Sequence, residues 1–224
     1  MKKLIILVPV VAFASSAFAR GQTFSDATFD LFDNNVANLD IVGVTVSNSA
    51  TDITFSVETR GFEAWTKYLF FLNTGAANQT GTNAWNRPVN LNGQTIDHYV
   101  GSWVDQASDN AQFWSFNGNW NLDYNFTNDQ SQAGSHIVSW TFSLASLGVG
   151  IGDKILFDVG TSGGGDNDTT VDLLSRDTQA TDWWTNPATA GEYRSYQIVP
   201  APGALALAGA AAAAAGLGRR RRQG

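Results

Sequence analysis

Apolar and polar positions alternate, or form short apolar blocks, along most of this chain. Ile53, Phe55 and Val57 alternate with polar residues, the period of two that is typical of a strand buried on one face. The apolar run 68–72 indicates a strand that is covered on both faces. Further strand-like segments, separated by turns rich in Gly and Asn, occur at 39–46, 95–104, 111–116, 135–144, 154–161 and 193–199. This pattern predicts a single all-β domain, an antiparallel β-sandwich over residues 20–199.

The clearest local turn is Asn117-Gly118-Asn119, which lies between Phe116 and Trp120. Asn-Gly dipeptides adopt the backbone angles of tight hairpin turns, so the strand 111–116 is expected to pair with the segment that follows the turn.

The N-terminus has a different pattern. Lys2 and Lys3 precede an apolar run at 4–14, and Ala17-Phe18-Ala19 follows. A basic start, a short apolar stretch and an Ala-x-Ala exit predict a helical secretory signal peptide over 1–19, removed by signal peptidase. A permanent membrane span needs roughly 20 apolar residues, so a retained anchor is the weaker alternative.

The C-terminus carries a second signal at 200–224. It begins with a proline motif made of Val199, Pro200, Ala201, Pro202 and Gly203. An apolar segment follows at 204–218 and is expected to be helical. The tail then carries a basic cluster, Arg219, Arg220, Arg221 and Arg222. Arginines after an apolar helix favour the cytoplasmic side and stop transfer through the membrane.

This tail resembles the PEP-CTERM sorting signal of Gram-negative bacteria, with Ala201 where that family has Glu. The resemblance implies transient insertion in the inner membrane and processing by an exosortase-like enzyme. It also implies delivery to the cell surface or the extracellular matrix. A plain C-terminal anchor is the alternative.

Charge and composition narrow the function of the domain between the two ends. It holds all 20 acidic residues against seven basic ones, a formal charge of −13. Such a charge disfavours nucleic acid and anionic membranes as partners. The chain has no cysteine, which excludes disulfides, a thiol nucleophile and Cys-based metal sites.

Two short motifs in the domain are distinctive: the hairpin-like stretch 40–57, and the segment Ser143-Leu144-Ala145-Ser146-Leu147-Gly148 followed by Gly152-Asp153 and a strand. These motifs are similar to those of DOMON-like sandwiches, including modules like carbohydrate-binding family nine. The resemblance implies a jelly-roll-type sandwich that in some members binds a sugar or a cofactor.

No catalytic motif is present. The only glutamates are Glu58, Glu63 and Glu192, and neither a Gly-x-Ser-x-Gly elbow nor a His-Glu-x-x-His zinc motif occurs. His98 and His136, the only histidines, are interpreted as structural or exposed residues. We therefore expect a protein that is not an enzyme.

Two acidic segments are candidate calcium sites. In the Gly-rich stretch 163–172, oxygen-bearing side chains alternate at Asp166, Asp168, Thr170 and Asp172, and calcium takes six to eight oxygen ligands. A comparable set comprises Asp30, Asp33, Asn34, Asn35 and Asp40. The alternative is that Asp and Asn simply shape solvated turns there.

Tryptophans supply the remaining candidates. Of eight in the chain, Trp85, Trp183 and Trp184 lie in polar loops, where an exposed indole face could stack on a sugar ring. Each could instead fold back onto the core. The sequence thus favours an exported, non-enzymatic surface or matrix protein that binds polysaccharide, with a purely structural or adhesive matrix component as the alternative and a polysaccharide hydrolase as a weaker one.

Overall fold

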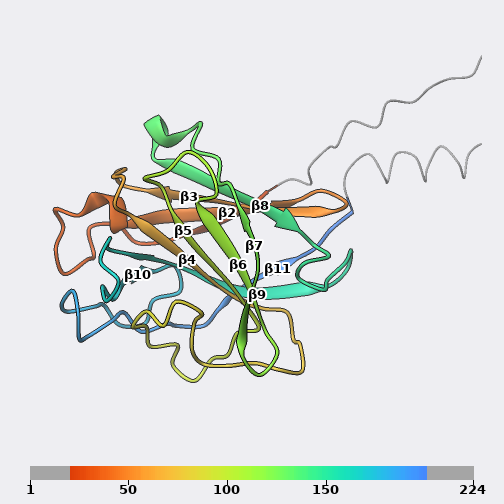
Figure 1. Cartoon of the computed structure of the whole chain (residues 1–224). Coiled ribbons are helices and arrows are strands. Elements are labelled where there is room, and N and C mark those ends of the chain that lie inside the picture. The colour runs from red at the N-terminus through yellow and green to blue at the C-terminus, as the bar shows by residue number, and fades with distance from the viewer. Residues whose placement is uncertain (1–20, 201–224) are drawn as a thin grey trace, which may run out of the picture.

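The computed structural model describes residues 21–200, and these residues form an all-β structure with two antiparallel sheets (Figure 1). The predicted signal peptide at 1–19 lies outside the described residues. So do the apolar segment and the arginines of the predicted tail, together with Ala201, Pro202 and Gly203 of its motif. Within the described part, no helix has the length and apolar character needed to cross a membrane.

The smaller sheet has four strands. In spatial order they are β1 (Gln22–Ser25), β2 (Ile41–Asn48), β3 (Asp52–Thr59) and β8 (Ile137–Ser143). The 3-10 turns η1 (Ala37–Leu39) and η2 (Ala133–Ser135) precede β2 and β8 along the chain.

The larger sheet has seven strands, and β9 is its branching point. One edge of β9 pairs with β4, and its other edge pairs with β10 and then with β11. The order is β10 (Thr170–Leu173), β9 (Lys154–Ser162), β4 (Lys67–Asn73), β5 (His98–Trp103), β6 (Ala111–Phe116) and β7 (Trp120–Phe126), with β11 (Arg194–Gln197) beside β9.

The main core lies between the two sheets. Phe55 of the smaller sheet packs edge-on against Phe70 of the larger one, with ring centroids 5.6 Å apart. Trp140 packs against Tyr68 at 4.8 Å and donates its indole N–H to the hydroxyl of Ser102 at 2.8 Å. All five residues are buried, so one apolar layer holds the sheets face to face in a sandwich-like arrangement.

A second apolar cluster covers the outer face of the larger sheet. Along β4, Tyr68, Phe70 and Leu72 join the main core, while Leu69 and Phe71 join this outer cluster under the loops. All five are completely buried. The prediction that 68–72 is covered on both faces is therefore confirmed.

Each of the eight segments expected to be strands contains an observed strand, and the turn at 117–119 joins β6 to β7 as predicted. Two strands were not expected. The edge strand β1 is short, polar and largely exposed, so it lacks an apolar alternation. The segment 170–173 was interpreted only as part of a metal loop, although all four residues of β10 are buried.

Both ends of the described chain leave the fold beside the same end of β2. Gln22 pairs with Val46, and the buried side chain of Asn48 bonds to the backbone of Val199 at both its amide and its carbonyl group. Val199, the first residue of the predicted sorting motif, is thus itself fastened to the fold.

Candidate functional site

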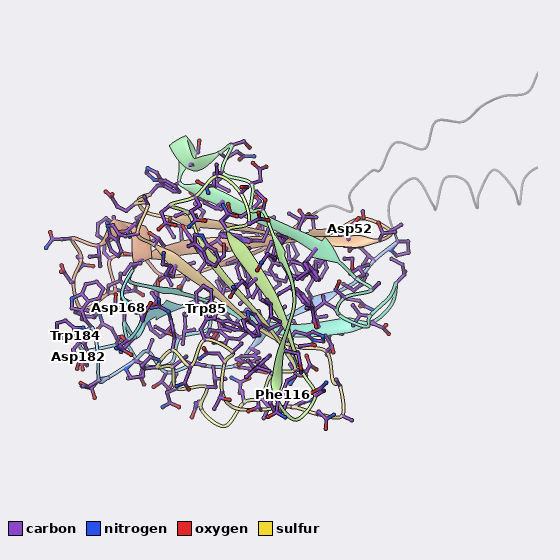
Figure 2. The ribbon with its side chains drawn as sticks, viewed as in Figure 1. Asp52, Trp85, Phe116, Asp168, Asp182 and Trp184 are labelled. Carbon is purple, nitrogen blue, oxygen red and sulfur yellow. The ribbon has the colours of Figure 1, made fainter. Side chains whose placement is uncertain are left out.

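A groove of about 350 Å³ opens on the outer face of the larger sheet. Its lining combines two indoles with charged and amide groups: Lys67, Trp85, Arg87, Trp103, Gln112 and Asp166. Three of these residues come from β4, β5 and β6, and the others from the loops 74–97 and 163–169. Figure 2 labels Trp85, which was a candidate from the sequence. The volume lies at the lower end of the range typical of small-ligand pockets.

A tight turn in the β4–β5 loop, residues 74–97, positions Trp85. The buried side chain of Asn83 accepts a bond from the amide of Arg87 at 3.0 Å and donates to its carbonyl at 2.8 Å. The indole N–H of Trp85 donates to Oε1 of Gln112 at 2.8 Å. The ring lies so close to Gly101 of β5 that a Cβ added there would be 2.3 Å from it.

Trp103, at the end of β5, supplies the second ring of the groove. Its centroid lies 6.0 Å from that of Trp85, and the two ring planes are inclined by 31°. Both side chains are only partly buried. The indole N–H of Trp103 is screened from solvent and has no partner among the described residues. Two tilted, partly exposed indoles offer apolar ring faces on which a ring-shaped ligand can stack.

Charged groups border these rings. Arg87 is 6% exposed; its Nη1 donates to the hydroxyl of Ser162 at 2.8 Å, and its guanidinium lies 5.8 Å from the Trp85 ring. Burial lowers the pKa of Arg87, while the nearby Tyr99, Asp168 and Asp166 counteract this effect. The groove therefore presents donors and an acceptor carboxylate around an aromatic surface.

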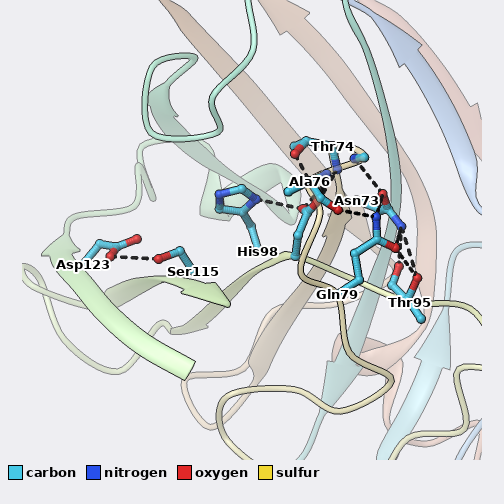
Figure 3. A network of polar contacts seen from close by, with 10 residues as sticks. Asn73, Thr74, Ala76, Gln79, Thr95, His98, Ser115 and Asp123 are labelled. Carbon is cyan, nitrogen blue, oxygen red and sulfur yellow. Dashed lines mark hydrogen bonds and ion pairs between the residues drawn. The ribbon is translucent and has the colours of Figure 1, made fainter. Parts of the chain in front are cut away.

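A polar network fastens both ends of the β4–β5 loop (Figure 3). The carboxylate of Asp97 accepts bonds from the amides of Thr74 and Ala76, each at 2.9 Å, and from Nδ1 of His98 at 2.8 Å. Burial alone would raise the pKa of Asp97, but these hydrogen bonds outweigh it and lower the pKa. His98 thus orients a loop anchor, in agreement with its interpretation as a structural residue.

The pair Trp183-Trp184 lies outside the groove. Trp183 packs edge-on against Phe32 at 5.2 Å, at a small apolar cluster, whereas Trp184 is 65% exposed. Asp182 accepts bonds from the amides of Trp184 and Thr185 and fixes this loop. Figure 2 shows Trp184 and Asp182 at the left rim, away from Trp85. One member of the pair therefore anchors the loop and the other faces out.

The predicted calcium loop does not gather its own acids. Asp166 is exposed at the groove, and Asp168 accepts a bond from the amide of Gly165 at 2.8 Å. Thr170 and Asp172 are buried in β10. Instead, Asp172 lies with residues of the other acidic segment, because oxygens of Asp30, Asp40 and Asp172 come within 4.8 Å of one another.

Comparison with known proteins gives no further assignment, since no family model, no curated protein and no solved structure matches this chain. The resemblances to sorting-signal proteins and to DOMON-like sandwiches therefore remain predictions.

Sequence reasoning missed most of the groove. Trp103 and Gln112 appeared only as positions within predicted strands, Lys67 comes just before the run 68–72, and Arg87 was not a candidate. A usable signal was present for Trp103: in β5, Tyr99, Gly101 and Trp103 share one face, and a glycine between two aromatic residues marks a place where another ring can approach.

Proposed function

We propose that this chain is an exported surface or matrix protein, not an enzyme, whose β-sandwich of the jelly-roll type binds polysaccharide in the Trp85–Trp103 groove. The observation that carries the proposal is the pair of tilted, partly exposed indoles surrounded by polar side chains. Sugar rings have apolar C–H faces that stack on indoles. Their hydroxyl groups both donate and accept hydrogen bonds, which suits Lys67, Gln112 and Asp166.

The sequence of the two ends supports export. A signal peptide over 1–19 and the sorting motif that begins at Val199 and Pro200 would pass the domain through the inner membrane and then to an exosortase-like enzyme. Mass spectrometry of the protein from its host tests this part. A chain that starts near Arg20 and ends near Pro200 is expected, whereas an intact Arg219–Arg222 cluster would indicate a retained anchor.

Binding is tested on a glycan array, followed by calorimetry with any polysaccharide retained. Trp103→Ala removes one stacking surface and should weaken binding about tenfold or more, equivalent to about 1.4 kcal/mol. Gly101→Ala adds a methyl group where the Trp85 ring lies, so the ring must move and binding should also fall. Trp184→Ala is the matched control, because that exposed indole lies outside the groove.

The outcomes separate the proposal from its alternatives. A wild-type chain that binds no glycan favours a purely structural matrix component. A chain that loses binding with Trp184→Ala and keeps it with Trp103→Ala places the site on the 181–186 loop. Turnover of a bound polysaccharide would show that the protein is a hydrolase.

A further inference from the structure

Four aspartates from distant parts of the chain lie together beside the β10 edge of the larger sheet. Asp26, Asp30 and Asp40 belong to the segment that joins β1 to β2, and Asp172 belongs to β10. Asp40 and Asp172 are completely buried, and the backbone amide of Ile41 donates to Asp172 at 2.8 Å. This contact brings together residues that are 131 positions apart.

Two arginines enter this cluster but do not balance it. Arg60 donates from Nε to Oδ2 of Asp40 at 2.5 Å, and Arg176 bridges Asp30 and Asp172 with its two terminal nitrogens. Four carboxylates and two guanidinium groups leave a formal charge of −2 when all are ionised. An uncompensated negative charge of this kind is costly away from water. A single divalent cation would neutralise it.

Unpartnered oxygens provide an observation that is independent of the charge. In the described residues, three buried carboxylate oxygens have no hydrogen-bond partner, and all three belong to this cluster: Oδ2 of Asp26, Oδ1 of Asp30 and Oδ1 of Asp40. The other oxygen of Asp40 is fully used, because it accepts from Arg60 and from the amide of Phe29 at 2.9 Å. A buried carboxylate oxygen without a partner is rare in folded proteins, and a bound cation would supply the missing partner.

We propose that Asp30, Asp40 and Asp172 bind one calcium ion, with Asp26 adding negative charge at its edge. Every available ligand is a hard oxygen, as calcium and magnesium both prefer. The oxygens come from an irregular loop and a bulged strand, at mutual distances up to 4.8 Å. Calcium accepts such irregular shells, whereas magnesium demands a near-ideal octahedron. Asp30 keeps a quarter of its side chain exposed, which gives an ion a way in.

The ion would fasten the 26–40 segment to β10 and hence stabilise the fold. Full-length protein treated with a chelator should bind one calcium ion per chain in calorimetry at pH 7.5. A calcium concentration one hundred times the Kd should raise the melting temperature by about 5–10 °C. The variants are Asp30→Asn and Asp40→Asn, which keep side-chain size and remove charge, with Asp168→Asn as the matched control.

Loss of the calorimetric signal and of the temperature shift in Asp30→Asn, with both kept in Asp168→Asn, is the expected result. Asp30→Asn is the decisive variant, because its side chain is partly exposed and its replacement should leave the fold intact even if Asp40→Asn does not fold. Two results would overturn the proposal. One is a wild-type chain with neither heat nor temperature shift at 10 mM calcium, a concentration about ten times the weakest Kd of extracellular calcium sites. The other is calcium binding that Asp168→Asn abolishes and Asp30→Asn leaves unchanged.

Discussion

Asp158, in the middle of β9, makes the stability of this protein depend on pH in an unusual direction. Its carboxylate is completely buried and accepts bonds from the hydroxyl of Ser175 at 2.5 Å and from the amides of Ser175 and Val159 at 3.0 and 2.9 Å. Burial is the largest effect on its pKa and raises it to about 6, although these hydrogen bonds and the nearby Arg194 favour the charged form. The folded protein therefore retains a proton on Asp158 that the unfolded chain releases.

The size of the effect follows from the two pKa values. An unfolded aspartate titrates near 3.8, so the folded value of about 6 is higher by about two units. At 1.36 kcal/mol per unit, the difference corresponds to about 3 kcal/mol. A raised carboxyl pKa favours the fold while the group is protonated. Its contribution is therefore largest below pH 3.8 and is lost as the pH rises through 6.

Asp158→Asn isolates this contribution, because the amide stays neutral at every pH and can still accept from the two backbone amides. We expect the free energy of unfolding of the variant, relative to wild type, to increase by about 2.4 kcal/mol between pH 4 and pH 7, because part of the full difference falls below pH 4. Urea unfolding at unit pH intervals measures it, and effects of other groups largely cancel in the difference.

Ser175→Ala serves as a second variant. It removes a hydroxyl bond that favours the charged carboxylate, so it should raise the pKa of Asp158 in the folded protein further. The free energy of unfolding of this variant should therefore fall by more than that of wild type as the pH rises. Curves for wild type and Asp158→Asn that stay parallel from pH 4 to pH 7 would refute the reasoning. So would a variant that loses relative stability as the pH rises.

Two further substitutions test how the fold is held together. Trp140→Ala should lower the free energy of unfolding by about 3–5 kcal/mol, because the ring is completely buried against Phe70 and bonds to Ser102. A loss below about 1 kcal/mol in urea unfolding would contradict its role between the sheets. Asn48→Ala should cost about 1–3 kcal/mol and speed proteolysis near Val199, because it removes both bonds to that residue; unchanged cleavage rates would show that Asn48 does not pin the C-terminal segment.

The strands could be predicted because their side chains obey simple alternation. The main core receives Ile53, Phe55 and Val57, whereas the unbroken run 68–72 contributes to both apolar clusters. The local sequence pattern therefore predicts whether a strand is buried on one face or on both. β1 and β10 were not predicted because their side chains do not show this relation between apolar character and burial. β10 buries the polar residues Thr170 and Asp172, and β1 is polar and largely exposed. β1 is held at the sheet edge mainly by backbone hydrogen bonds to β2, and such bonds form whatever the side chains are.

The groove could be predicted only in part, since it depends on the path of a loop. Trp85 stood out because a tryptophan in a polar loop is unusual. Nothing local to residues 74–97 shows that the loop folds back over β5 and β6 to place that ring on Gly101 and Gln112. Alternation puts Trp103 and Gln112 on a given face of the sheet, but only the fold shows that the same loop reaches both.

The acidic segments show how tertiary structure changes an interpretation made from sequence. Taken separately, 30–40 and 163–172 are two candidate calcium sites, each with its own ligands, and they would predict two ions per chain. In the fold, Asp172 turns away from Asp166 and Asp168 and joins Asp30 and Asp40, because the amide of Ile41 at the start of β2 holds its carboxylate. The remaining acids of 163–172 face solvent or the groove. The proposed site therefore predicts one ion per chain, and the measured stoichiometry distinguishes this merged site from two separate loops.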